Sequence, residues 1–194
     1  IKYIKEDKGV DIDFHVIGYD DPKVYELISS GDCTAIFQLE SGGMTKFMNQ
    51  LQPSCLEDVM AGISMYRPGP MQFLDDFLKG KKNPEKVEYA HPLLKEVLEV
   101  TYGCIVYQEQ VMQISMHMCG FSAGESDSRI RKPVAKKKIK MLTDEVFHWE
   151  DGKDETIYDH WMNGAAANDY SAQIAQKIWD DVLEFASYAF NKSH

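Results

Sequence analysis

The sequence lacks several features that define whole classes of protein. No run of about 18 consecutive apolar residues occurs, so we expect no transmembrane helix and no membrane partner. There is no internal repeat and no low-complexity segment. The four cysteines are far apart and form no C-x-x-C pair (Cys33, Cys55, Cys104 and Cys119). Because each has apolar neighbours, we expect buried, reduced thiols in a cytosolic protein rather than a disulfide framework.

The sequence also lacks an initiator methionine and a signal peptide. It opens within a helix-like pattern, IKYIKEDK, and stops at FNKSH. We therefore expect a segment excised from a longer polypeptide. Its 194 residues, 44% of them hydrophobic, suffice for one domain or two small ones with a buried core.

Positive charge is scarce and unevenly placed. The chain has 21 Lys and Arg against 31 Asp and Glu, and its pI is near 5.0. Seven of the cations lie in RIRKPVAKKKIK, residues 129–140, which holds no acidic residue; elsewhere 14 cations face 31 acids. This balance argues against a protein that coats nucleic acid or an anionic membrane over its whole surface. Contact with phosphate should be local, and we expect it at residues 129–140.

Apolar periodicity predicts a mainly α fold with one or two short β-strand pairs. Apolar residues three and four apart, with Pro or Gly at the boundaries, indicate helices over residues 1–8, 22–30, 44–51, 53–66, 73–79, 91–102, 107–119 and 171–190. The run CTAIFQLE, residues 33–40, has the β-branched and aromatic content of a short strand. A second short strand is expected at the start of CIVYQEQ, from residue 104.

Two segments interrupt this helical pattern. Pro133 disfavours a long uninterrupted helix through the basic stretch and favours a loop, a kink or a helix start. Residues 143–160, TDEVFHWEDGKDETIYDH, are strongly acidic and predict an exposed loop. His148 and His160 lie among acids there, but their spacing matches no metal-binding motif, so we expect no metal site.

Five segments occur in a fixed order along the chain. They are GDCTAIFQLESGGM (31–44), MYRPGPM (65–71), YGCIVYQEQVMQI (102–114), IRKPVAKKK (130–138) and YAFNKSH (188–194). In sequence, order and spacing they resemble the catalytic alpha subunit of bacterial DNA polymerase III, a C-family replicative polymerase. The resemblance covers nearly the whole chain, and the matched region is the fingers, which follows the palm.

The resemblance implies a DNA-directed DNA polymerase, a nucleotidyltransferase of bacterial chromosome replication. Its expected partners are template-primer DNA, dNTP, the rest of the polymerase chain and, through other regions, replisome subunits. The expected location is the bacterial cytoplasm, at the nucleoid. Residues 1–30 would be the palm-to-fingers connection and first helices, and residues 31–194 would be the fingers, with an exposed acidic segment at 143–160.

Magnesium is the cofactor that the resemblance implies, held by palm aspartates that lie outside this segment. Asp11 and Asp13 have D-x-D spacing but not the family's surrounding context. We therefore expect no catalytic residue, no bound metal and no activity in this segment alone.

In the family the basic block reads approximately L-R-R-A-M-G-K-K-K and acts on the triphosphate of the incoming nucleotide. The resemblance assigns nucleotide contact to Arg131, Lys132, Lys136, Lys137 and Lys138. Lys132 replaces a second arginine, so it keeps the charge but loses the bidentate fork. Pro133 and Val134 replace a small residue and a methionine, and one residue is inserted around Ser128-Arg129. These departures leave the side-chain register of residues 129–135 open.

Lys192, in FNKSH, lies in a family segment near the nucleotide site and is assigned nucleotide contact as well. Further possible contacts to nucleotide or DNA are Gln38, Ser41, Arg67, Gln108, Asn191 and His194. Structural roles account for some of these residues equally well. Ser41 can cap the next helix, Arg67 can brace the Pro-Gly-Pro turn, and Asn191 can end a helix.

A different class of function stays open. A non-catalytic nucleic-acid-binding or interaction module would use the basic loop 129–140 to grip backbone phosphates. Such binding should weaken steeply with salt and ignore triphosphates. A nucleotide pocket should instead prefer dNTP with magnesium and lose that preference on Arg131→Ala. A basic loop that serves only solubility would show neither behaviour.

Overall fold

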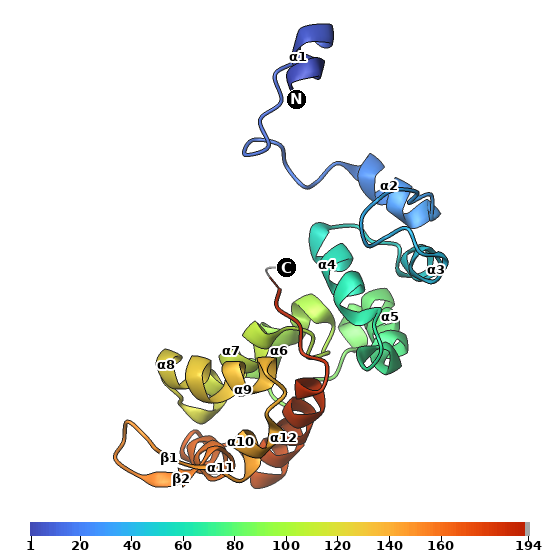
Figure 1. Cartoon of the computed structure of the whole chain (residues 1–194). Helices are drawn as coiled ribbons and strands as arrows, with labels where there is room; N and C mark the ends of the chain where they lie inside the picture. The colour runs from blue at the N-terminus through green and yellow to red at the C-terminus, as the bar shows by residue number, and fades with distance from the viewer. Residues whose placement is uncertain (193–194) are drawn as a thin grey trace. The chain divides into compact units, whose positions relative to one another are not determined.

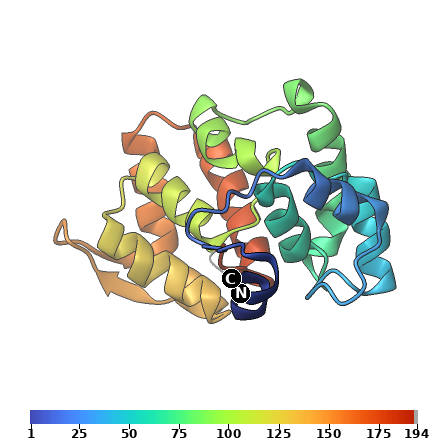
Figure 2. The ribbon, with the colours of Figure 1, turned by 90° about the horizontal axis from the view of Figure 1, so that it is seen from above.

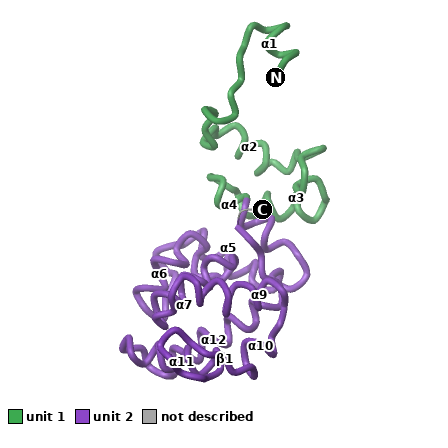
Figure 3. The backbone as a smooth tube through the Cα atoms, turned by 60° about the vertical axis from the view of Figure 1, so that its left-hand side comes forward, with its two compact units in different colours: residues 1–59 green, residues 60–194 purple. Residues whose placement is uncertain are grey.

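The computed structural model describes residues 1–192 and divides into two compact units, residues 1–59 and 60–194 (Figure 3). The division falls within α4 (Leu56–Met65). The fold is mostly helical, as predicted (Figure 1). Within the described residues no helix combines the length and the apolar character that crossing a membrane requires.

The first unit holds three complete helices; the first two match the predicted bounds within one residue, and the third begins two residues earlier than predicted. They are α1 (Lys2–Lys8), α2 (Pro22–Ser30) and α3 (Gly42–Leu51). The Asp21 carboxylate accepts the Lys23 N–H before α2, and the Ser41 hydroxyl accepts the Met44 N–H before α3. Both side chains satisfy backbone donors that a helix start leaves unpaired. The capping role considered for Ser41 is therefore present.

The strand predicted over residues 33–40 is wrong. Ala35 and Gln38 have φ angles of 62° and 64°, in the left-handed region that an extended strand cannot contain. The Ile36 N–H donates to the Cys33 carbonyl, and the Leu39 N–H donates to the Ile36 carbonyl. The segment therefore forms two consecutive turns between α2 and α3. Its β-favouring composition is overridden because Cys33 and Leu39 are buried in this turn conformation.

The second unit contains the remaining elements. Its α-helices are α5 (Leu74–Lys82), α6 (Pro92–Leu98), α7 (Gln108–Cys119), α8 (Ala123–Glu125), α9 (Lys132–Ala135), α10 (Ile139–Thr143), α11 (Ile157–Ala167) and α12 (Ala172–Ala186). Short turns of 3-10 helix occupy η1 (Pro70–Phe73), η2 (Pro84–Lys86) and η3 (Glu99–Thr101). The segment η4 (Ser126–Arg131) is π-helical.

One hydrophobic core joins α6, α7, η4, α9, α11 and α12. Trp161 on α11 and Trp179 on α12 pack with ring centroids 5.3 Å apart, and both are buried. The Trp161 indole N–H donates to the Ala175 carbonyl at 3.2 Å, so its polar atom is satisfied inside the core. The core also anchors the basic segment, because the buried side chains of Ile130 and Val134 belong to it.

The two strands lie inside the acidic segment 143–160, where a loop was predicted. β1 (Val146–His148) pairs antiparallel with β2 (Asp154–Thr156), and His148 lies opposite Asp154. Most residues of the segment are exposed, but Trp149 and Ile157 are buried in the core. These two apolar anchors fix a hairpin against α11, which explains why a highly charged segment is ordered.

All four cysteines are free thiols. Cys33 and Cys119 are buried, whereas Cys55 and Cys104 are only partly buried. Burial raises the pKa of the Cys104 thiol to about 12. At neutral pH this thiol is protonated and therefore a poor nucleophile.

Candidate functional site

The basic stretch lies on one helical run that extends from α8 through η4 to α9. Ser122 begins the run with a capping box: its hydroxyl accepts the Glu125 N–H, and the Glu125 carboxylate accepts the Ser122 N–H. Ser126 is fully buried and shares a 2.7 Å hydrogen bond with Ser115 of α7. These contacts anchor the side of the helix opposite to its cations.

The π-helical segment η4 contains the site of the insertion expected around Ser128-Arg129 and ends two residues before Pro133. The Lys132 N–H donates to the Asp127 carbonyl, five residues back, as in a π-helix. This pattern accommodates one extra residue in the turn, so the helix on either side can keep its register. α9 continues η4 without a break, because Arg131, the residue before it, is itself helical (φ −59°, ψ −47°). The loop or helix start expected at Pro133 is therefore not found. Pro133 and Val134 are buried.

Asp127 is the immediate partner of the two cations at the end of η4. Its Oδ1 atom contacts Arg131 Nε at 2.6 Å and Nη2 at 2.5 Å, and its Oδ2 atom lies 2.8 Å from Lys132 Nζ. Hydrogen bonds from Lys132 and Arg131 lower the pKa of the Asp127 carboxyl. The side chain of Arg131 is 30% exposed and that of Lys132 is 53% exposed. Asp127 therefore orients two cations at the surface while it neutralises one charge.

Sequence reasoning missed Asp127, although the signal was present. Asp127 and Arg131 are four residues apart, the spacing at which opposite charges meet on a helix. The π-helical turn brings Lys132, five residues away, to the same carboxylate.

The next three lysines end the helix. The Lys138 N–H donates to the Pro133 carbonyl, and the Lys137 N–H donates to the Val134 carbonyl. These are the two bonds of a Schellman motif, with Lys137 at the left-handed position (φ 54°). All three side chains are exposed, and none makes an ion pair within residues 1–192. Their charges also complement the negative end of the helix dipole.

Replacing Lys137 with glycine should separate backbone strain from charge. Lys137→Gly removes a side chain that disfavours positive φ, so we expect the free energy of unfolding to rise by up to about 1 kcal/mol. Lys136→Gly, at φ −92°, relieves no such strain and should lower it by about 0.5–1 kcal/mol. Chemical denaturation of the two variants measures the difference. Equal destabilisation by both changes would contradict the Schellman assignment.

The C-terminal segment lies against the start of α7. Tyr107 and Phe190 form a parallel β-bridge, in which the Gln108 N–H donates to the Phe190 carbonyl at 2.9 Å. The Lys192 N–H donates to the Glu109 carboxylate at 3.2 Å, and Lys192 Nζ lies 5.6 Å from the centre of the Tyr107 ring. The strand expected near residue 104 is thus reduced to this single bridge. The contacts place Lys192 at the N-terminus of α7.

Arg67 also contacts the C-terminal segment, at Tyr188 and Phe190. Its guanidinium donates to the Ser64 carbonyl at 2.8 Å and to the Tyr188 carbonyl at 3.1 Å, and it lies 4.4 Å from the centre of the Phe190 ring. Desolvation by burial lowers the pKa of Arg67. These contacts show the bracing role for Arg67; a contact with nucleotide or DNA stays a prediction.

The bracing role predicts a local effect of Arg67→Lys. Lysine keeps the charge but loses the planar fork that reaches both carbonyls and stacks on the ring. We expect amide exchange to quicken about tenfold at Gln108, whose N–H bonds the Phe190 carbonyl, and to stay unchanged at Ile114 in the core. Hydrogen-exchange mass spectrometry with overlapping peptides resolves the two sites. Unchanged exchange at Gln108 would contradict the bracing role.

Part of the predicted set is brought together. In Figures 1 and 2 the end of α9 lies beside the segment that follows α12. The cations of α9 and Lys192 are thus carried by neighbouring segments of one unit. Gln108 is only 7% exposed, so its side chain offers little surface to a ligand. Asn191 lies in the same C-terminal segment, and His194 lies outside the described residues.

Gln38 and Ser41 belong to the first unit, residues 1–59. Both are exposed, and Ser41 accepts the Met44 N–H. Their contacts to nucleotide or DNA stay predictions.

A pocket of about 320 Å³ lies beside Arg67. Its walls include Arg67 and Lys177 but also the carboxylates Asp76, Glu88, Asp181 and Glu184. This charge balance disfavours a triphosphate there. The exposed cations after η4 are the better match for a polyanion.

The two carboxylates with D-x-D spacing, Asp11 and Asp13, both have partners in the fold. The Asp11 carboxylate pairs with Lys5 Nζ at 2.5 Å, and the Asp13 carboxylate accepts the His15 N–H at 2.9 Å. Within the described part of the chain, three metal-ligating side chains gather closely at Asp151, Glu155 and His160 instead.

Comparison with known proteins gives the chain's relatives. Residues 1–156 match the family described as the bacterial DNA polymerase III alpha subunit finger domain. The chain is 42% identical over 193 residues to the DNA polymerase III subunit alpha of Aquifex aeolicus, covering 98% of this chain and 16% of that protein. It is 41% identical over 194 residues to the subunit of the same name from Staphylococcus epidermidis, covering 100% of this chain and 17% of the relative. The chain thus spans about a sixth of the length of these relatives.

Proposed function

This chain belongs to the bacterial DNA polymerase III alpha subunit family and matches its finger domain, and on that basis we propose that it serves a DNA-directed DNA polymerase by binding the triphosphate of the incoming dNTP. The proposed partners are template-primer DNA and the rest of the polymerase chain, with replisome subunits bound through other regions. Magnesium would be held by residues outside this segment, and no step of the proposal uses a metal bound by this chain.

The observation that carries the proposal is the concentration of exposed cations around the end of one anchored helix. Residues 131–138 hold five Lys or Arg beside the single carboxylate of Asp127. A nucleoside triphosphate carries about four negative charges, which phosphoryl transfer requires the site to neutralise. The surrounding chain is acidic, so this surface is where a polyanion gains most from the protein's own field.

The individual cations are suited to different tasks. Asp127 uses the Nε and Nη2 atoms of Arg131, and within residues 1–192 Nη1 makes no hydrogen bond or ion pair. Arg131 can therefore stay oriented by Asp127 while it donates to phosphate oxygens. Lys132, Lys136, Lys137 and Lys138 act as point charges. Because these lysine side chains are exposed, each can move with the phosphates as the leaving pyrophosphate gains negative charge.

The alternative module, which would grip the nucleic-acid backbone, makes a different prediction for the same residues. A triple variant that replaces Lys136, Lys137 and Lys138 with glutamine separates the two functions in a complete polymerase chain that carries this segment. We expect the KM for dNTP to rise at least about tenfold, because three charges near the triphosphate are lost. The dissociation constant for template-primer DNA should change less than about threefold.

The contrary result would favour the backbone-binding module. In that case DNA affinity would fall, and the KM for dNTP would stay near its original value. The slope of log Kd against log salt concentration would decrease by about three, because three phosphate contacts are lost. Lys82→Gln, Lys95→Gln and Lys177→Gln supply a control triple of equal charge change at exposed positions outside residues 129–140. This control keeps the net charge of the two proteins matched.

A further inference from the structure

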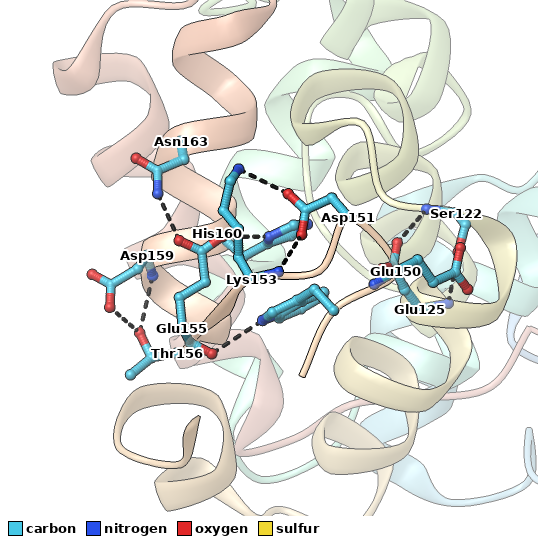
Figure 4. Close-up of polar contacts among 11 residues, drawn as sticks. Ser122, Glu125, Glu150, Asp151, Lys153, Glu155, Thr156, Asp159, His160 and Asn163 are labelled. Atoms are coloured by element: carbon cyan, nitrogen blue, oxygen red, sulfur yellow. Dashed lines mark hydrogen bonds and ion pairs between the residues drawn. The ribbon is translucent and has the colours of Figure 1, made fainter. Parts of the chain in front are cut away.

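The β1–β2 hairpin and the start of α11 bring together three side chains that ligate metals. Asp151 is in the hairpin turn, Glu155 is on β2, and His160 is in the first turns of α11. One ligand atom from each lies within 4.8 Å of the other two. Figure 4 shows these side chains gathered between the hairpin and the helix. The cluster combines an imidazole with two carboxylates, so it is more than a group of surface acids.

Each prospective ligand is held by groups around it. The His160 ring stacks on Trp149 with centroids 3.7 Å apart and an interplanar angle of 6°, and the Phe121 ring packs against it at 5.0 Å. Glu155 Oε2 accepts the Asn163 amide N–H at 2.8 Å. Asp151 Oδ1 accepts the Lys153 backbone N–H at 3.1 Å. Metal ligands typically need such supporting contacts to fix their orientation.

The three side chains are partly buried but can still be reached from solvent. The side chains of Glu155 and His160 are each 13% exposed, and that of Asp151 is 40% exposed. A cavity of about 440 Å³ opens beside them, lined by Asp151, His160 and Asn163 among others. It leaves room for an ion and for the water molecules that complete its coordination. Glu125 and Glu150 also line this cavity, which adds negative charge around it.

Two contacts show how the cluster is satisfied without a metal. His160 Nδ1 lies 2.7 Å from Glu155 Oε1. Lys153 Nζ lies 2.8 Å from Asp151 Oδ2, and its side chain is 61% exposed. The lysine ammonium thus supplies the positive charge that a metal ion would otherwise bring. Because Lys153 is long and exposed, it can leave the cluster without disturbing the fold.

We propose that Asp151, Glu155 and His160 form a binding site for a divalent transition-metal ion of the Zn²⁺ class, which ties the hairpin turn to α11. Zinc favours one or more imidazole nitrogens with carboxylate oxygens at about 2.0–2.2 Å in tetrahedral geometry. In that geometry neighbouring ligand atoms are about 3.4 Å apart, so the present separations close by small side-chain rotations. Magnesium prefers six oxygen ligands and fits an imidazole-containing set poorly. The site is structural and is independent of the triphosphate surface.

Zinc titration of the 194-residue chain, first stripped with a chelator, tests the proposal. We expect a saturable change in tryptophan fluorescence, because Trp149 stacks on the ligand His160, together with a rise in the thermal unfolding midpoint. Trp149→Phe should remove the fluorescence change and keep the thermal shift. Magnesium at about a hundredfold higher concentration should produce neither signal.

Four variants locate the site. His160→Gln and Glu155→Gln should each weaken zinc binding at least about tenfold. Lys153→Met should tighten it about threefold or more, because it removes the competing ammonium. His148→Gln is the matched control: His148 pairs with Asp154 at 2.9 Å on the same hairpin but is not one of the three ligands, so binding should stay within about twofold.

The opposite results would overturn the proposal. An absence of zinc-dependent change in the unsubstituted chain, or zinc binding that survives His160→Gln and Glu155→Gln, would show that the three side chains do not form a zinc site. Weaker binding in Lys153→Met would also contradict it. That variant is expected to gain affinity, so misfolding cannot imitate its predicted result.

Discussion

Arg131→Ala should lower kcat/KM for every dNTP about 10²-fold in a complete polymerase chain that carries this segment. Its guanidinium is held at the surface by Asp127 through Nε and Nη2, so its remaining donors are already oriented when a triphosphate arrives. A donor that is already oriented loses little conformational entropy when it binds a phosphate, so it contributes more binding free energy than a mobile donor. Its removal therefore costs more. Steady-state primer extension with each dNTP measures the effect.

Arg129→Ala is the matched control for this change. Arg129 lies on the same helical run, but its guanidinium packs 4.3 Å from the centre of the Phe147 ring. It should alter kcat/KM less than about threefold. Arg131→Lys should fall between the two, because lysine restores the charge without the fork. If Arg129→Ala and Arg131→Ala reduced kcat/KM equally, the loss of positive charge in general, and not a specific contact of Arg131 with the triphosphate, would explain the result.

Gly164→Ala should lower the free energy of unfolding by at least about 3 kcal/mol. A Cβ atom at Gly164 would lie 1.9 Å from the Cys119 carbonyl oxygen and 2.8 Å from its carbonyl carbon. The obstacle is backbone at the end of α7, so it cannot rotate away as a side chain can. The helices α7 and α11 would have to separate, and the core around Trp161 would open. Denaturant unfolding followed by tryptophan fluorescence measures the loss.

Gly124→Ala provides the comparison at another helical glycine. A Cβ there meets nothing closer than 3.9 Å, at the Glu150 and Ser122 side chains. Alanine has the higher helix propensity, so we expect a gain of up to about 1 kcal/mol. A loss below about 1 kcal/mol for Gly164→Ala would mean that the close crossing of α7 and α11 is not maintained in solution.

Many of the helices could be predicted from sequence because local signals mark their ends, whereas α11 was not predicted. Asp21-Pro22 and Ser41 supply caps, and Gly120 ends α7 in the left-handed conformation. The failures occurred where long-range packing overrides local preference. Residues 33–40 read as a strand but have no partner strand and form turns. Residues 143–160 read as a loop because their charges hide two buried anchors, Trp149 and Ile157.

The candidate surface was predictable in composition but not in geometry. The cations of residues 131–138 are evident from charge alone, whereas the role of Asp127 depends on a π-helical turn. The ligand cluster at the hairpin depends on strand register, which places Glu155 and His160 beside the turn residue Asp151. Asp151, Glu155 and His160 are four and five residues apart, a spacing that matches no known metal-binding motif. The cluster is therefore visible only in the folded hairpin.

The central claim is that residues 131–138 contact the triphosphate, and affinity labelling tests it most directly. A dNTP with an arylazide on its γ-phosphate can be photolysed on the complete polymerase with template-primer DNA, and the labelled peptide can be identified by mass spectrometry. The account predicts labelling within residues 131–138 that requires the complementary template base and is displaced by the unmodified dNTP. Displaceable labelling confined to other peptides, with residues 131–138 unmodified, would contradict it.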